Sequence, residues 1–158
     1  MMKKVKSDEA VELSIFQVAE IICAVDITKI VEIIKHLDLT LVKNAPSFVR
    51  GVASLRGEII TVIDVRAKFG LEPIPLNEDM RIIVVNYQNE NTGLLVDKII
   101  DVNRVEQNSI GPLTSNINSV NKDYFSGIYT MENDLSAILN LDELLVFDHK
   151  SSDNKVLV

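Results

Sequence analysis

Residues 51–65, GVASLRGEIITVIDV, form two apolar runs that meet at Arg56-Gly57. With the two-residue period of a strand, residues 58–65 carry apolar side chains on both faces in the middle of the run. An antiparallel strand with one solvated face alternates more cleanly between apolar and polar residues. The pattern therefore predicts a hairpin whose second strand is covered on both sides, as in a small β-barrel that packs against a second barrel.

Similar short β-rich runs continue along the chain and are separated by turn residues. Tight turns are predicted at Ala19-Glu20, at 88–91 and at 132–134. They join three pairs of expected strands: 12–18 with 21–25, 80–87 with 92–105, and 125–131 with 135–141. Strands at this near-regular spacing predict a closed or sandwiched all-β fold.

Helical structure is expected in a few short pieces. Segment 26–37 has apolar residues at helical spacing after Asp26, a residue that caps helices, but it is also dense in β-branched residues. We predict one helical turn that passes into a strand near Val31. Three further short helical pieces are predicted: one that starts at Pro46, a single turn at 66–70 that Gly70 ends, and a helix at 140–147 capped by Asn140.

Length and composition predict one domain with a sizeable core, because 47% of the 158 residues are apolar. We expect this domain to span residues 12–148, between flexible polar tails at 1–11 and 149–158. The formal net charge of −7 disfavours nucleic acid and anionic membranes as partners.

The expected location is the cytoplasm. A single cysteine, Cys23, excludes an internal disulfide framework and is typical of a reducing compartment. The lysines near the start are followed by acidic residues, where a signal peptide would turn apolar. No apolar run approaches the ~20 residues of a membrane span, so direct membrane insertion is not expected.

The residues that carry enzyme chemistry are scattered. His36 and His149 lie far apart in the sequence, Cys23 has no cysteine neighbour, and the glycines form no phosphate-binding loop. Asp64 is interpreted as the partner of Arg66 in a structural ion pair at a strand end. We therefore expect no enzyme, no metal and no cofactor. A β-barrel that binds a small ligand stays open as an alternative, although aromatic residues make up only 5% of the chain.

Residues 44–70, NAPSFVRGVASLRGEIITVIDVRAKFG, resemble the signature of the CheW family, the coupling proteins of bacterial chemotaxis. The resemblance extends over residues 12 to about 148 through four further segments: VDITKIVEI (25–33), GLLVD (93–97), DYFSGI (123–128) and ILNLDELL (138–145). It implies two packed five-stranded SH3-like barrels with a few short helices.

The function implied by the resemblance is that of a non-enzymatic adapter. Such proteins couple the cytoplasmic tips of chemoreceptors, which are long helical hairpins, to the regulatory domain of a CheA-type histidine kinase. The protein would then be recruited to membrane-associated receptor arrays. A coupling protein of a related pathway, such as type IV pilus motility, is the alternative within the same fold.

The resemblance also implies two sets of contact residues. The receptor-contacting positions of the family fall on Ile30, Glu32, Gly51, Arg56, Ile99 and Val102. The charged members of this set, Glu32 and Arg56, are expected to pair at the rim of an apolar groove. For Ile99 and Val102, simple core packing is the alternative. The kinase contacts are expected at Ile27, Leu39 and Leu41, each as an exposed apolar side chain.

One segment departs from the family pattern. Gly111 and Asn116 occupy positions where many members carry a basic residue and a phenylalanine that take part in ring assembly with the kinase domain. The sequence leaves open whether this protein forms such rings.

Overall fold

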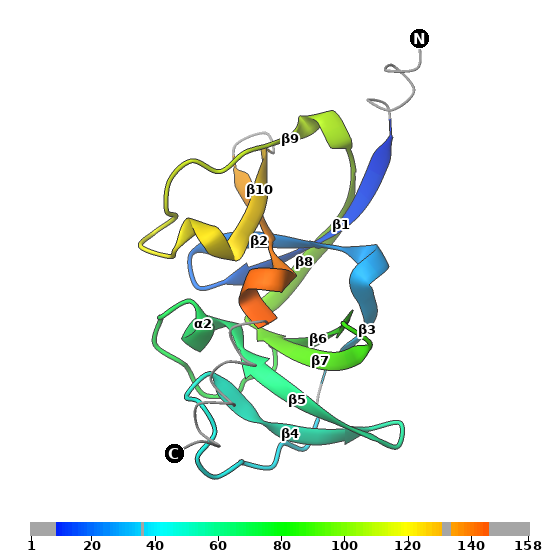
Figure 1. Cartoon of the computed structure of the whole chain (residues 1–158), viewed down its shortest axis with the longest axis vertical. Helices are drawn as coiled ribbons and strands as arrows, with labels where there is room; N and C mark the ends of the chain where they lie inside the picture. Colours follow the sequence, from blue (N-terminus) through cyan, green and yellow to red (C-terminus); the bar gives the residue numbers. More distant parts are fainter. Residues whose placement is uncertain (1–8, 36, 131–133, 146–158) are drawn as a thin grey trace.

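The computed structural model describes residues 9–35, 37–130 and 134–145, and it consists of two β-sheets that pack on each other (Figure 1). The first sheet contains six strands in the order β8-β1-β2-β11-β10-β9: Lys98–Glu106, Ala10–Val18, Ile21–Asp26, Leu135–Leu139, Phe125–Thr130 and Ile110–Gly111. The second contains five strands in the order β3-β6-β7-β5-β4: Ile30–Ile34, Arg81–Tyr87, Glu90–Val96, Glu58–Asp64 and Val49–Leu55. The predicted all-β fold is confirmed.

Within the described residues, helical structure is confined to single turns and one short helix that follows β11. The named pieces are α2 (Val65–Lys68), η1 (Ile27–Lys29), η2 (Gln107–Ser109) and η3 (Lys122–Tyr124). Residues 141–145 are also helical, and Asn140 caps them by accepting a hydrogen bond from the Glu143 amide at 3.3 Å. The predicted turn after Asp26 and the predicted stop at Gly70, whose φ is +84°, are confirmed.

Three apolar clusters form the core. The largest lies between the sheets and includes Phe16 and Val25 of the first sheet with Ile83 and Leu94 of the second. Each sheet also has a core of its own: Leu13, Ile15, Ala24 and Val105 in the first, and Ile60, Val62, Met80, Ile82, Val84 and Leu95 in the second. Strand β6 alternates between the inter-sheet core and the core of its own sheet.

The prediction that both faces of residues 58–65 are covered is confirmed from Ile60 onward. Ile60 and Val62 fill the core of the second sheet, whereas Ile63 belongs to the inter-sheet core. At the start of the strand the prediction is wrong, because Ile59 is 71% exposed to solvent.

The implied pair of packed SH3-like subdomains is confirmed, with differences in strand number and in closure. The first sheet has a sixth strand, the short β9, and the described residues contain no strand ladder that joins the edges of either sheet. In the second sheet an isolated bridge between Thr40 and Val52, with N–O distances of 2.8 and 2.9 Å, connects the chain after β3 to β4.

Three local predictions were wrong. No helix starts at Pro46: its carbonyl accepts a hydrogen bond from the Val49 amide at 3.0 Å in a turn, and β4 begins at once. The run 92–105 is not one strand, because the chain leaves the second sheet at Val96 and enters the first at Lys98. Strand β1 begins at Ala10, which was assigned to the N-terminal tail.

The hairpin turns agree with the sequence. Ala19-Glu20 joins β1 to β2, and Gln88-Asn89 joins β6 to β7 with positive φ at both turn residues. Strands β10 and β11 pair as expected, but most of the predicted turn at 132–134 lies outside the described residues. Residues 1–8 and 149–158 of the predicted tails also lie outside the described residues.

Candidate functional site

The candidate site begins at the tip of the β4–β5 hairpin. Leu55 pairs with Glu58, so Arg56 and Gly57 form a two-residue turn with φ of +51° and +84°. Positive φ at both central residues fits the right-handed twist of the flanking strands. The turn projects Arg56 away from the hairpin, and its side chain is 76% exposed.

Arg56 pairs with Glu32 of β3, as the family resemblance implied. Arg56 donates from Nε to Oε2 of Glu32 at 2.8 Å and from Nη2 to Oε1 at 3.0 Å. Two parallel bonds of this kind fix the planes of both groups. The guanidinium also holds the pKa of Glu32 below its usual range, mainly through these hydrogen bonds.

Strand β3 presents Glu32 beside apolar side chains. Ile30 lies opposite Val85 and Glu32 lies opposite Val84, so Val31 is the extra residue of a β-bulge. Because of this bulge, Ile30 and Glu32 lie opposite residues of β6 that face different cores: Val85 faces the inter-sheet core and Val84 the core of the second sheet. Ile30 packs against the inter-sheet core, and Val31 is exposed.

A second bulge shapes β8, the edge strand of the first sheet. Phe16 lies opposite Ile99 and Ile15 lies opposite Asp101, so Ile100 is the extra residue. Ile99 and Val102 therefore lie on the same face of β8, although an odd spacing of three places residues of a regular strand on opposite faces. Ile99 packs against the inter-sheet core and Val102 is 51% exposed. Core packing thus explains the position of the Ile99 side chain, whereas the Val102 side chain lies mainly at the surface.

Gly51 does not join this surface. It is buried at a bulge of β4, and a Cβ atom there would lie 2.7 Å from the Thr40 carbonyl oxygen. The missing side chain allows the Thr40–Val52 bridge to form, so the local role of Gly51 in this fold is structural.

The candidate kinase contacts differ in exposure. Leu41 is 83% exposed, whereas Ile27 in η1 and Leu39 are half-buried, and Leu39 packs against the core of the second sheet. The expectation that all three are exposed is therefore wrong for Ile27 and Leu39. A hollow of about 440 Å³, lined in part by Thr40, Val52 and Ile59, adjoins this segment.

Sequence reasoning missed several exposed apolar side chains beside the predicted positions. Val31, Ile33 and Ile100 extend the apolar surfaces of the two bulged edge strands, Val42 follows Leu41, and Ile59 lines the hollow beside Thr40. Val31 and Ile100 are the extra residues of the bulges, which sequence periodicity does not reveal.

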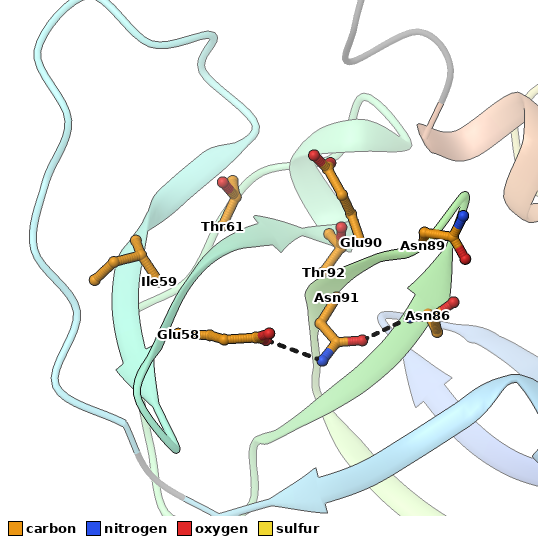
Figure 2. Close-up of a pocket in the computed structure, with 8 residues that line it drawn as sticks. All are labelled: Glu58, Ile59, Thr61, Asn86, Asn89, Glu90, Asn91 and Thr92. Atoms are coloured by element: carbon orange, nitrogen blue, oxygen red, sulfur yellow. Dashed lines mark hydrogen bonds between the residues drawn. The ribbon is translucent and has the colours of Figure 1, made fainter.

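A polar hollow of about 500 Å³ lies over the second sheet, with its walls on β5, β6 and β7 (Figure 2). Asn91 is central: its Nδ2 donates to Glu58 at 3.3 Å, and its Oδ1 accepts from Asn86 at 2.9 Å. The hollow is a surface feature, because apolar side chains fill the core of this sheet. This packing weighs against an enclosed ligand pocket.

Asp64 has a different partner from the predicted one. Its Oδ2 accepts from Arg50 Nη1 at 2.6 Å, while Arg66 bonds to Asp97. His36 and His149 lie outside the described residues. Among residues 9–35, 37–130 and 134–145, no three His, Cys, Asp or Glu side chains are placed to hold a metal ion. In the same ranges no helix is long and apolar enough to cross a membrane.

Comparisons with known proteins agree with this architecture. The chain is 31% identical to a chemotaxis protein CheW of Helicobacter pylori over 92% of this chain and 88% of that protein. It is 29% identical to the CheW of Klebsiella aerogenes over 93% of this chain and 86% of that protein. The solved structure of the scaffolding protein TtCheW of Thermoanaerobacter tengcongensis superposes with a TM-score of 0.81 at 29% identity, covering 87% of this chain and 93% of that one. A family model described as the CheW-like domain matches residues 12–148, and the chain therefore belongs to the CheW-like domain family.

Proposed function

We propose that this protein is a non-enzymatic adapter of bacterial chemosensory signalling, which binds the cytoplasmic tip of a chemoreceptor and a histidine kinase at separate surfaces. Relatives over most of the chain are named chemotaxis proteins, and the structural relative is called a scaffolding protein. Two observations carry the proposal: the Glu32–Arg56 pair, with exposed Val31 and Ile33 on either side of Glu32, and the exposed Ile100 and Val102 of edge strand β8.

The receptor surface consists of Ile30, Glu32 and Arg56 on one side and Ile99 and Val102 on the other. Ile30 and Ile99 pack against the same inter-sheet core, so both strands border the junction of the two sheets. Exposed apolar groups beside an ordered ion pair suit an amphipathic helix, whose apolar face covers the former while its polar edge meets the latter. A receptor tip offers such a helix.

The kinase surface centres on Leu41 and includes Leu39. Leu41 is followed by exposed Val42, and exposed Ile59 lines the hollow beside Thr40. Exposed apolar side chains that gather in this way mark protein-binding sites. Ile27 is half-buried in η1, which contacts β1 and β6, and it is not included in this surface. Both partners place the protein at the cytoplasmic side of the membrane, where receptor tips lie.

Binding measurements with two separate partners test the proposal. Isothermal titration calorimetry would use a coiled-coil fragment of a receptor tip and the regulatory domain of a kinase, both from the same genome as this chain. Val102→Asp is expected to weaken receptor binding alone, and Leu41→Asp to weaken kinase binding alone. Leu135→Asp, the same change at an exposed strand residue outside both surfaces, is the control. Wild-type protein that binds neither fragment would contradict the adapter function.

A further inference from the structure

Asp97 is the single residue between two strands that belong to different sheets. Val96 ends β7 in the second sheet, and Lys98 begins β8 in the first. The backbone amide of Asp97 donates to the Gln17 carbonyl of β1 at 3.0 Å. The direction in which the chain crosses from the second sheet to the first is therefore set at this residue.

The carboxylate of Asp97 also connects the two sheets. Oδ2 accepts from the Ala19 amide, in the β1–β2 turn of the first sheet, at 2.8 Å. The same oxygen accepts from Arg66 Nη2 at 2.7 Å, and Oδ1 accepts from Arg66 Nε at 2.9 Å. Arg66 belongs to α2, which packs on β5 and β7 of the second sheet. One side chain is thus bonded to both halves of the molecule, and it is only 18% exposed.

Strand β8, which follows Asp97, carries one half of the proposed receptor surface. Ile99 follows two residues later, and the bulge at Ile100 then turns Val102 to the same face. Ile30, the apolar residue of the other half, lies on the second sheet. The distance between the two halves depends on how the sheets are held together.

We propose that Asp97 is a positioning residue: with Arg66 and the Ala19 amide it fixes the arrangement of the two sheets, and so the separation of the Ile30 and Ile99–Val102 halves of the receptor surface. This inference rests on the proposed function. The kinase surface around Leu41 lies within the second sheet and its adjoining segment, so its geometry does not depend on Asp97.

Asp97→Asn is the most direct variant. Both carboxylate oxygens accept hydrogen bonds, so an amide nitrogen at either position would face an N–H donor. Asp64→Asn is the matched control: Asp64 also accepts from an arginine, Arg50, and from a backbone amide of α2, but all its partners belong to the second half of the molecule. Arg66→Gln is a second test variant that leaves the Ala19 contact in place.

Three measurements separate an effect on the arrangement of the sheets from an effect on stability. Spin labels at Ser54→Cys on β4 and Ser126→Cys on β10, both exposed, report the distance between the sheets by double electron–electron resonance. Calorimetry with the receptor-tip fragment and with the kinase domain reports binding at each surface. Thermal unfolding of each variant gives its stability.

We expect Asp97→Asn and Arg66→Gln to broaden or shift the distance distribution and to weaken receptor binding by about tenfold, with kinase binding unchanged. Asp64→Asn should lower the melting temperature without changing the distance distribution. An unchanged distribution in both test variants, an equal change in Asp64→Asn, or equal losses of receptor and kinase binding would each overturn the inference. If wild-type protein does not bind the receptor fragment, the proposed function fails, and the distance measurements still decide whether Asp97 fixes the sheets.

Discussion

Arg56 and Glu32 link the two edges of the second sheet. Glu32 lies on β3 at one edge, and Arg56 lies at the tip of the hairpin that contains β4, the other edge. The pair complements the Thr40–Val52 bridge, which connects the chain after β3 to β4. An exposed arginine at an apolar hairpin is explained by this contact as well as by the proposed receptor rim.

Charge reversal tests whether these two residues act as a unit. Glu32→Lys and Arg56→Glu should each weaken receptor binding, because each places like charges together. Their melting temperatures should change little, since exposed ion pairs contribute little to stability. The double swap, Glu32→Lys with Arg56→Glu, should recover part of the lost binding if the residues interact directly. Strictly additive losses, measured by calorimetry, would show that they act independently, and unchanged binding in both single variants would move the receptor site elsewhere.

The Glu32 carboxyl should titrate at a lower pH in the wild type than in Arg56→Gln. Its pKa is lowered in the folded protein, so the contribution of the pair is present above the unfolded value of about 4.3 and is lost as pH falls through the folded value. Carbon-13 NMR of the Glu32 side chain measures both midpoints. Equal midpoints in the two proteins would mean that the ion pair does not persist in solution.

Gly51→Ala should destabilise the protein by about 1–3 kcal/mol, the usual range for overpacking. The new Cβ would meet the Thr40 carbonyl oxygen at 2.7 Å and the Leu39 Cβ at 3.3 Å, so the Thr40–Val52 bridge must open. Hydrogen exchange should quicken at the Thr40 and Val52 amides. Gly111→Ala is the matched control, because nothing lies within 4 Å of its Cβ position and no unfavourable φ is involved. Equal stability of both variants would contradict this structural role for Gly51.

Much of the architecture followed from the sequence because its signals are local. Turn residues at Ala19 and at 88–91 and the caps at Asp26 and Asn140 act over a few residues, and the structure places each as expected. The Glu32–Arg56 contact spans two strands that are not neighbours in the sheet, and only the family resemblance predicted it.

The features that the sequence did not predict depend on sheet pairing. The bulges at Val31 and Ile100 leave no mark in an apolar run, yet they decide which side chains of β3 and β8 face the core. The crossing at Asp97 interrupts an apolar run without a glycine or proline. The proline at 46 suits the first turn of a helix, but pairing of the following residues in β4 prevails over that local preference.

Cys23 should resist thiol reagents in the folded protein. Its side chain is fully buried in the inter-sheet core, and burial, assisted by the negative charge of Asp97, raises its pKa far above the usual thiol range. The thiolate is the reactive form, so thiol–disulfide exchange at pH 8 must await opening of the junction between the sheets. Reaction with 5,5′-dithiobis(2-nitrobenzoic acid) is expected to be slow in buffer and fast in urea, whereas the exposed thiol of Ser126→Cys should react at once in both.

If the Asp97 carboxylate holds the sheets together, Asp97→Asn should speed the native-state reaction of Cys23 more than Asp64→Asn does at equal loss of melting temperature. A wild-type Cys23 that reacts as fast as the exposed thiol would contradict the burial of this residue between the sheets.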